Sequence, residues 1–286
     1  MKKILTKKNL IYLLCGLVVV AIMASFVALV AVPSVKRTAV KVAKEDLFEN
    51  LYSFPEGAVI TAKNGFGDNK DNSLLYVKSA LQNSADCIEV DLCFDEDGTP
   101  YIASQDDEIT ANTMPLEYLV SYIADAVKST GRQYHINLHL TDASNIQLAG
   151  EIISRYEMED HCFFTGININ QASYIRKNCN ISFYIDYDID KSKSSDPEYA
   201  SRIINELSMS GAVGINCKAD AFSELMMNML KENWLKISFY DVETELEIIE
   251  ALSFSPNQII TEKPQAVRSI LTEWNANAPS SDIIPS

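Results

Sequence analysis

The sequence predicts a (β/α)8 barrel of the TIM type, with a hairpin excursion after its second strand and one transmembrane helix before it. Two observations predict this fold class. An uncharged stretch, Leu10–Val32, precedes the rest of the chain. From residue 58 onward, eight short runs of β-favouring residues alternate with amphipathic stretches of helical period. Such alternation is typical of parallel strands joined by helical crossovers.

The N-terminal segment is predicted to anchor the protein in a membrane. After a short basic segment, residues 1–9, the 23 residues of Leu10–Val32 carry no charge. As a helix they span about 34 Å, which is enough to cross a hydrocarbon core. A cleaved signal peptide is the alternative, but the apolar run is longer than the usual hydrophobic region of about 7–15 residues.

The lysine-rich N-terminal side favours an N-inside orientation. We therefore expect a single-pass protein of the cell membrane, with its barrel on the extracytoplasmic side. In this interpretation residues 33–56 form a juxtamembrane stalk, 57–275 form the barrel, and 276–286 form a disordered tail.

Composition limits the partners that can be expected. The formal net charge is −15, and because residues 1–44 hold eight cations and no acid, the rest of the chain has 16 basic and 39 acidic residues. Nucleic acid is therefore not an expected partner, since binding its phosphates requires a basic face. The five cysteines after the anchor have no zinc-like spacing, and we interpret them as buried thiols.

The elements follow in order along the barrel. The first strand is expected at 58–63 and the last at 258–261, and the segment Tyr101–Ser104 follows the second strand too closely for a parallel crossover. It should therefore pair as a hairpin. A doubly wound open sheet is the alternative fold. The remaining expected strands are 87–93, 134–140, 162–165, 181–187, 212–217 and 235–240, and the expected helices are Leu74–Gln82, Leu116–Lys128, Ile146–Tyr156, Ala200–Ser208, Phe222–Lys231 and Glu243–Ala251.

Two of these strands carry polar residues on one face. In 87–93, Glu89 and Asp91 alternate with apolar residues, and in 134–140 Asn137 and His139 do the same. Because helices cover the outside of a barrel, the polar face should line the lumen. Buried carboxylates need a partner, so this pattern predicts a ligand or metal site, or a network in which Lys63 neutralises the two acids.

Several segments together resemble the glycerophosphodiester phosphodiesterase family. They are Val59–Gly65, Asp71–Ser73, Cys87–Leu92, Asp97–Ile102 and Gln258–Pro264. Their order and spacing are similar to those of the family from about residue 58 to 275. The resemblance implies a phospholipase-C-like barrel that cleaves phosphodiesters with two histidines and a divalent cation.

Transferred residue by residue, the resemblance breaks at the catalytic positions. The family's first histidine falls on Lys63 and its second on Ser104, while the arginine after the first histidine falls on Asn64. The loss of one positioned acid or base costs a factor of about 10²–10⁴ in rate, and here both histidines are replaced.

The resemblance also implies a cation site, in which Mg²⁺ or Ca²⁺ would bind the substrate phosphate. The family's metal carboxylates are kept as Glu89 and Asp91, and a third falls on His139. The implied ligand-binding residues are Lys63, Asn64, Asp71 and His139.

Two functions remain open from the sequence. The first is a catalytically impaired relative that binds a phosphoryl or polyol ligand, a lipid headgroup or a protein partner at the barrel mouth. The second is an active, metal-dependent phosphoric diester hydrolase of lipid metabolism that uses His139, Lys63 or a group that a shifted alignment would place there, such as Gln105 in place of Ser104. The sequence does not specify the oligomeric state.

Overall fold

The computed structural model describes residues 32–50 and 59–277 of the chain. Eight parallel strands close into a barrel, because the first strand pairs with both the last strand and the second. This closure confirms the (β/α)8 fold and excludes the open-sheet alternative. The strands are β1 (Val59–Ala62), β2 (Cys87–Phe94), β5 (His135–Leu140), β6 (Cys162–Ile167), β7 (Ser182–Asp186), β8 (Gly214–Cys217), β9 (Lys236–Phe239) and β10 (Gln258–Thr261).

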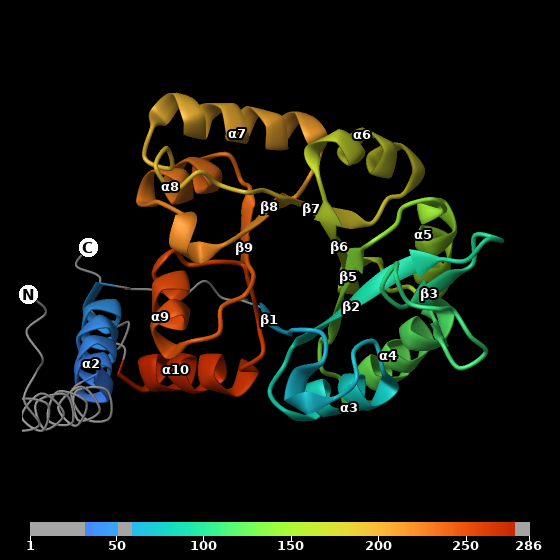
Figure 1. The fold of residues 1–286 in the computed structure, drawn as a ribbon, viewed down its shortest axis with the longest axis horizontal. Helices are drawn as coiled ribbons and strands as arrows, with labels where there is room; N and C mark the ends of the chain where they lie inside the picture. Colours follow the sequence, from blue (N-terminus) through green and yellow to red (C-terminus); the bar gives the residue numbers. More distant parts are fainter. Residues whose placement is uncertain (1–31, 51–58, 278–286) are drawn as a thin grey trace, which may run out of the picture.

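Helices surround these strands as an outer ring (Figure 1). Side-chain caps at Ser73, Asn168, Asp196, Ser223 and Thr244 satisfy free N–H groups where five of the helices begin. The helices of the ring are α3 (Leu74–Gln82), α4 (Leu116–Thr130), α5 (Ile146–Arg155), α6 (Ile169–Asn178), α7 (Pro197–Ser210), α8 (Glu224–Glu232), α9 (Glu245–Ser253) and α10 (Pro264–Asn277).

The excursion after the second strand is present as expected. β3 (Pro100–Ile102) pairs antiparallel with β2, with Cys93 opposite Tyr101, and then with the short β4 (Met114–Pro115). At the β2–β3 turn, the Asp95 carboxylate accepts the backbone N–H of Thr99, and Gly98 has a φ of +77°. Glycine takes this left-handed conformation without the strain of a side chain.

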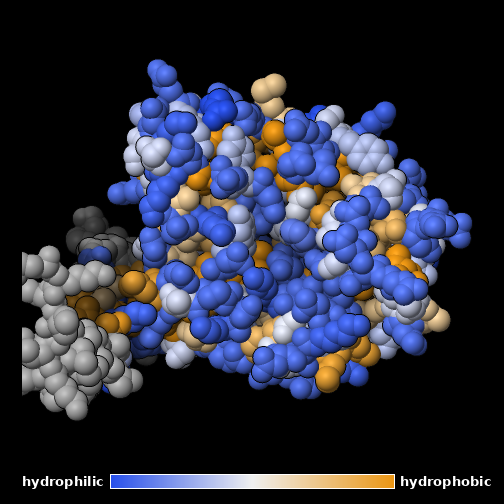
Figure 2. All heavy atoms as spheres, in the orientation of Figure 1, coloured by the Kyte–Doolittle hydropathy of each residue, from blue (hydrophilic) through white to orange (hydrophobic). Residues whose placement is uncertain are grey.

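The strands divide their faces as the sequence indicates. Ile88, Val90 and Leu92 of β2 are fully buried toward the helices, while the alternate residues Glu89 and Asp91 point into the mouth of the barrel. The barrel interior is polar for part of its length. It contains the buried side chains of Asn137, Thr165, Asn216, Ser238 and Gln258. Hydrophilic residues also cover most of the molecular face seen in Figure 2.

A helix precedes the barrel and packs on its outside. α2 (Val32–Asn50) lies beside α9 (Figure 1). Leu47 is buried in this contact, and Lys44 forms ion pairs with Glu245 and Glu273 at 2.8 and 3.1 Å. Thus much of the segment expected to be a stalk is a helix in contact with the barrel.

Most of the expected anchor lies outside the described residues. None of the described helices is both long enough and apolar enough to span a membrane. The anchor within 10–32 therefore stays a prediction, as does the character of the tail at 276–286, most of which is also outside the described residues. Two helices of the ring, α6 and α10, are absent from the sequence expectations.

Candidate binding site at the barrel mouth

A cavity of about 460 Å³ lies where the barrel strands end. Apart from Glu89, which lies deeper in β2, each lining residue is in the C-terminal part of a strand or in the loop that follows it, which is where the active sites of TIM barrels occur. The lining residues are Lys63, Asn64, Asp71, Glu89, Asp91, His139, Asp186, Asn216, Tyr240, Asp241 and Ile260.

Asp91 is the centre of a hydrogen-bond network between two mouth loops. Its Oδ2 accepts bonds from the side-chain amides of Asn64 and Asn72 at 3.2 and 3.0 Å, and a short bond from the Ser104 hydroxyl. Asn64 and Asn72 also bond to each other, both through their side-chain amides and through the backbone N–H of Asn72. The carboxylate therefore connects the β1–α3 loop to the segment after β3.

Glu89 lies deeper and has fewer partners. The side-chain amide of Asn137 donates to its Oε2 at 3.2 Å, and the Asn137 carbonyl oxygen accepts from Thr165 at 2.8 Å. Burial, with a smaller contribution from the Asp91 charge, raises the pKa of Glu89 to about 8. This carboxyl group is therefore mainly protonated at neutral pH.

A similar chain of hydrogen bonds between neighbouring strands lies on the other side of the lumen. Asp186 accepts from the Asn216 amide at 2.9 Å and from the Gly166 N–H at 3.1 Å, while the Ser238 hydroxyl donates to Asn216 at 2.8 Å. Burial raises the pKa of Asp186 despite these bonds. The carboxyl groups on both sides of the lumen thus obtain their partners from neighbouring strands.

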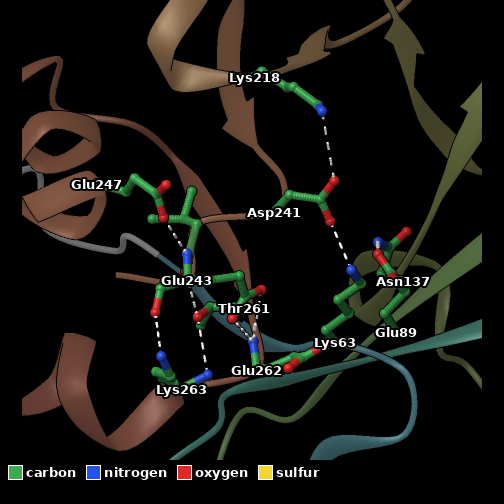
Figure 3. Close-up of polar contacts among 11 residues, drawn as sticks. Lys63, Glu89, Asn137, Lys218, Asp241, Glu243, Glu247, Thr261, Glu262 and Lys263 are labelled. Atoms are coloured by element: carbon green, nitrogen blue, oxygen red, sulfur yellow. Dashed lines mark hydrogen bonds and ion pairs between the residues drawn. The ribbon is translucent and has the colours of Figure 1, made fainter. Parts of the chain in front are cut away.

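Lys63 does not pair with Glu89 or Asp91 as the network interpretation expected. Its Nζ donates to Asp241 at 2.7 Å, and the Lys218 ammonium approaches the second oxygen of Asp241 at 4.0 Å (Figure 3). The bond to Asp241 is the largest of the effects that raise the pKa of Lys63. Asp241 itself has a φ of +55°, a conformation uncommon outside glycine.

The histidines do not form a pair at the mouth. The chain has three, and only His139 lines the cavity, where its Nδ1 lies 3.4 Å from the Thr165 hydroxyl. His135 and His161 do stack, with ring centroids 5.3 Å apart. They lie at the opposite end of the barrel, where β5 and β6 begin, and the His161 Nδ1 is 2.8 Å from the carbonyl oxygen of Tyr134.

The donor set fits a divalent cation poorly. Within the described residues, no three His, Cys, Asp or Glu side chains are grouped as a metal ion requires. Oδ2 of Asp91 already accepts three protein hydrogen bonds. Glu89, the other expected carboxylate ligand, accepts the Asn137 amide at its Oε2. We therefore derive no chemical step through a metal at this mouth.

Sequence reasoning located one side of the site. Lys63, Asn64, Asp71, Glu89, Asp91 and His139 all line the cavity, and Ser104 reaches it through its bond to Asp91. The residues that it missed are Asp186, Asn216, Tyr240 and Asp241. The available signal was a polar residue at the end of each later strand, which has meaning only once the strand ends are known.

Comparisons by sequence identify no relative. No protein-family model matches the chain, and no curated protein sequence does either. Comparison of the fold is informative, because many solved structures match it. The class that the fold defines is a (β/α)8 barrel.

Several of the similar solved structures are described as glycerophosphodiester phosphodiesterases. One from Agrobacterium tumefaciens, described as putative, has a TM-score of 0.61 at 14% identity and covers 77% of this chain and 99% of its own. A second putative enzyme, from Silicibacter pomeroyi, has a TM-score of 0.60 at 12% identity, with coverages of 80% and 98%. A phosphodiesterase from Oleispira antarctica, in complex with the product sn-glycerol-3-phosphate, has a TM-score of 0.52 at 16% identity, with coverages of 76% and 97%. At these identities the likeness establishes the fold and leaves the chemistry to be argued from the site.

Proposed function

We propose that this protein is a membrane-anchored, glycerophosphodiester phosphodiesterase-like barrel that binds a small ligand at its mouth without hydrolysing it. The proposal rests on one observation. His139 is the single histidine that lines the cavity, because the other two histidines of the chain lie at the opposite end of the barrel. Hydrolysis by a base and an acid of imidazole type needs two such groups at the reacting bond.

The residues at the two substituted positions do not replace this pair. Lys63 is held by Asp241, which raises its pKa, whereas a general base needs a pKa near the working pH. Ser104 donates a hydrogen bond to Asp91, and a serine hydroxyl is too weak an acid to act as a general acid near neutrality. Both groups therefore serve to organise the mouth.

The proposal includes no divalent cation in the mouth, in contrast to the Mg²⁺ or Ca²⁺ that the family resemblance implies. Its support is that Oδ2 of Asp91 already accepts three protein hydrogen bonds, and that within the described residues no three His, Cys, Asp or Glu side chains are grouped as a metal ion requires. Thermal unfolding in the presence and absence of MgCl₂ and CaCl₂ tests this part. An increase in Tm that disappears in Asp91→Ala would contradict it.

Hydrolysis is tested directly on the full chain. Glycerophosphocholine and an aryl phosphodiester are supplied with Mg²⁺ or Ca²⁺, and release of product is followed. We expect no turnover above that of the Glu89→Ala variant. Turnover that disappears in Glu89→Ala would establish the alternative, an active phosphoric diester hydrolase.

The anchor is proposed from Leu10–Val32, whose length and lack of charge suit a membrane span. The full chain should remain in the membrane fraction after a carbonate wash, with its barrel accessible to protease from the extracytoplasmic side. A chain that begins at residue 32 should be released. Recovery of the full chain in the wash would exclude the anchor.

A further inference from the structure

The donor groups of the mouth cavity are largely used by the protein itself. Lys63 donates to Asp241 at 2.7 Å, and the amides of Asn64 and Asn216 donate to Asp91 and Asp186 at 3.2 and 2.9 Å. A phosphoryl group presents only acceptor oxygens and binds through donors and cations. Within the described residues, the Tyr240 hydroxyl and the Nε2 of His139 make no hydrogen bond, but they share the cavity with five acidic side chains, which repel an anion.

Its acceptor groups are more open. Within the described part of the chain, the Asp71 carboxylate accepts no hydrogen bond, and neither does Oδ2 of Asp241, which lies 4.0 Å from the Lys218 ammonium. The ring of Tyr240 lines the same cavity, and the Lys218 Nζ lies 6.0 Å from its centroid. A carboxylate oxygen beside an aromatic face is a favourable environment for an ammonium group.

The two lysines at Asp241 differ in how easily a ligand could displace them. Lys63 is hydrogen-bonded to Oδ1 of Asp241, and its side chain is half-buried. Lys218 reaches Oδ2 from the end of β8 without a hydrogen bond, and its side chain is 58% exposed (Figure 3). An exposed ion pair of this length contributes little and is easily displaced.

We propose that the ligand of the mouth is an organic ammonium compound, whose N–H groups bind Oδ2 of Asp241 beside Tyr240 in the position that the Lys218 ammonium now holds. This inference rests on the proposed binding function and specifies its ligand class. It differs from the phosphoryl ligand that the family resemblance implies, because five acidic side chains and one lysine line this mouth.

Because Lys218 is positively charged, the proposal predicts the direction in which its removal changes the affinity for an amine. The full chain is titrated with ethanolamine and spermidine, and in parallel with inorganic phosphate, and binding is measured by calorimetry. Because Lys218 competes with the ligand, Lys218→Ala should tighten ethanolamine binding about two- to fivefold. Weaker ethanolamine binding in this variant, or tight phosphate binding that requires Lys218, would overturn the proposal.

The Asp241→Asn variant should have the opposite effect on amine binding. Asparagine keeps the size of the side chain and tolerates a positive φ, so the fold should persist, while amine binding should decrease at least tenfold. Unchanged Tm confirms that the variant is folded, and unchanged amine affinity would refute the site.

Lys191→Ala is the matched control. Lys191 is exposed in the loop after β7 and does not line the cavity, so its removal changes net charge equally without freeing Asp241. An equal gain in amine affinity would show that the net charge of the protein attracts the amine, and it would overturn the specific site. Hydrolysis of glycerophosphocholine, measured separately, would instead overturn the proposed non-catalytic function.

Discussion

At the residue scale, the mouth is organised around the Asp91 carboxylate. Asn64 and Ser104, which the sequence resemblance aligns with an arginine and a histidine, both donate to Asp91. The carboxylate is thereby stabilised by neutral donors from its own chain, where a metal site would leave its oxygens open. The substitutions are therefore mutually consistent as a structural network.

Removing one of these donors should weaken the fold modestly. Ser104→Ala leaves Asp91 with two side-chain donors and should lower the free energy of unfolding by about 1–2 kcal/mol, measured by urea denaturation. Ser129→Ala is the control, because Ser129 is exposed and bonds only to its own helix. Equal effects of the two variants would show that the Asp91 network contributes nothing to stability.

Glu89 predicts a dependence of stability on pH. Its pKa is about 8 in the folded protein against 4.5 for the free group, so the folded state retains a proton that the unfolded chain releases between these values. The contribution of Glu89 to the free energy of unfolding is present below pH 4.5 and is lost as pH rises through about 8.

Glu89→Gln mimics the protonated form and should remove that dependence. The variant should match the natural protein near pH 5 and unfold at a Tm several degrees higher at pH 8.5. Thermal scans across this range measure the difference. A constant difference in Tm at every pH would show that Glu89 does not retain its proton.

At the element scale, α2 is the part of the structure that joins the predicted anchor to the barrel. Its Leu47 is buried against the barrel while Val42, on the same helix, is 58% exposed. Lys44 adds two ion pairs, and its pKa is raised by its bonds to Glu245 and Glu273 against the opposing effect of burial. Packing and charge thus hold this helix to α9 and α10.

Leu47→Ala should detach α2 more than it unfolds the barrel. Loss of a buried leucine side chain costs about 2–5 kcal/mol where it packs, so hydrogen exchange should accelerate in 32–50 while β2 and β5 remain protected. Val42→Ala is the control on the same helix and should leave exchange unchanged. Uniform acceleration across the barrel strands would contradict a local role.

At the scale of the whole molecule, charge separates the chain into a basic N-terminal part and an acidic remainder. The cations before residue 45 precede a body with 16 basic and 39 acidic residues, and five acids line the mouth cavity. Repulsion within such a body opposes its compact state and is screened by salt. The same charge attracts cationic ligands.

Salt should therefore stabilise the protein. Raising NaCl from 0.02 to 0.5 M should increase Tm by about 2–5 °C, because the Debye length falls well below the distances between rim acids. An osmotically matched concentration of sorbitol provides the control. A decrease in Tm with salt would indicate that ion pairs such as Lys63–Asp241 outweigh the repulsion.

The sequence by itself determined the order of barrel strands, the hairpin after β2 and the polar face of β2 and β5, because alternation with period two is a local property of each strand. It missed α6, whose start is fixed by a capping box at Asn168 and Gln171 rather than by a clear apolar face.

Only the tertiary structure decided which polar groups meet at the mouth. Lys63 and Asp241 are 178 residues apart, and their bond at 2.7 Å exists because β1 and the end of β9 are placed near each other by barrel closure. The His135–His161 pair lies away from the mouth for a different reason, because His135 begins β5 and His161 directly precedes β6. Periodicity reports the face on which a residue lies, whereas its partner across the barrel depends on strand stagger, which no single strand encodes.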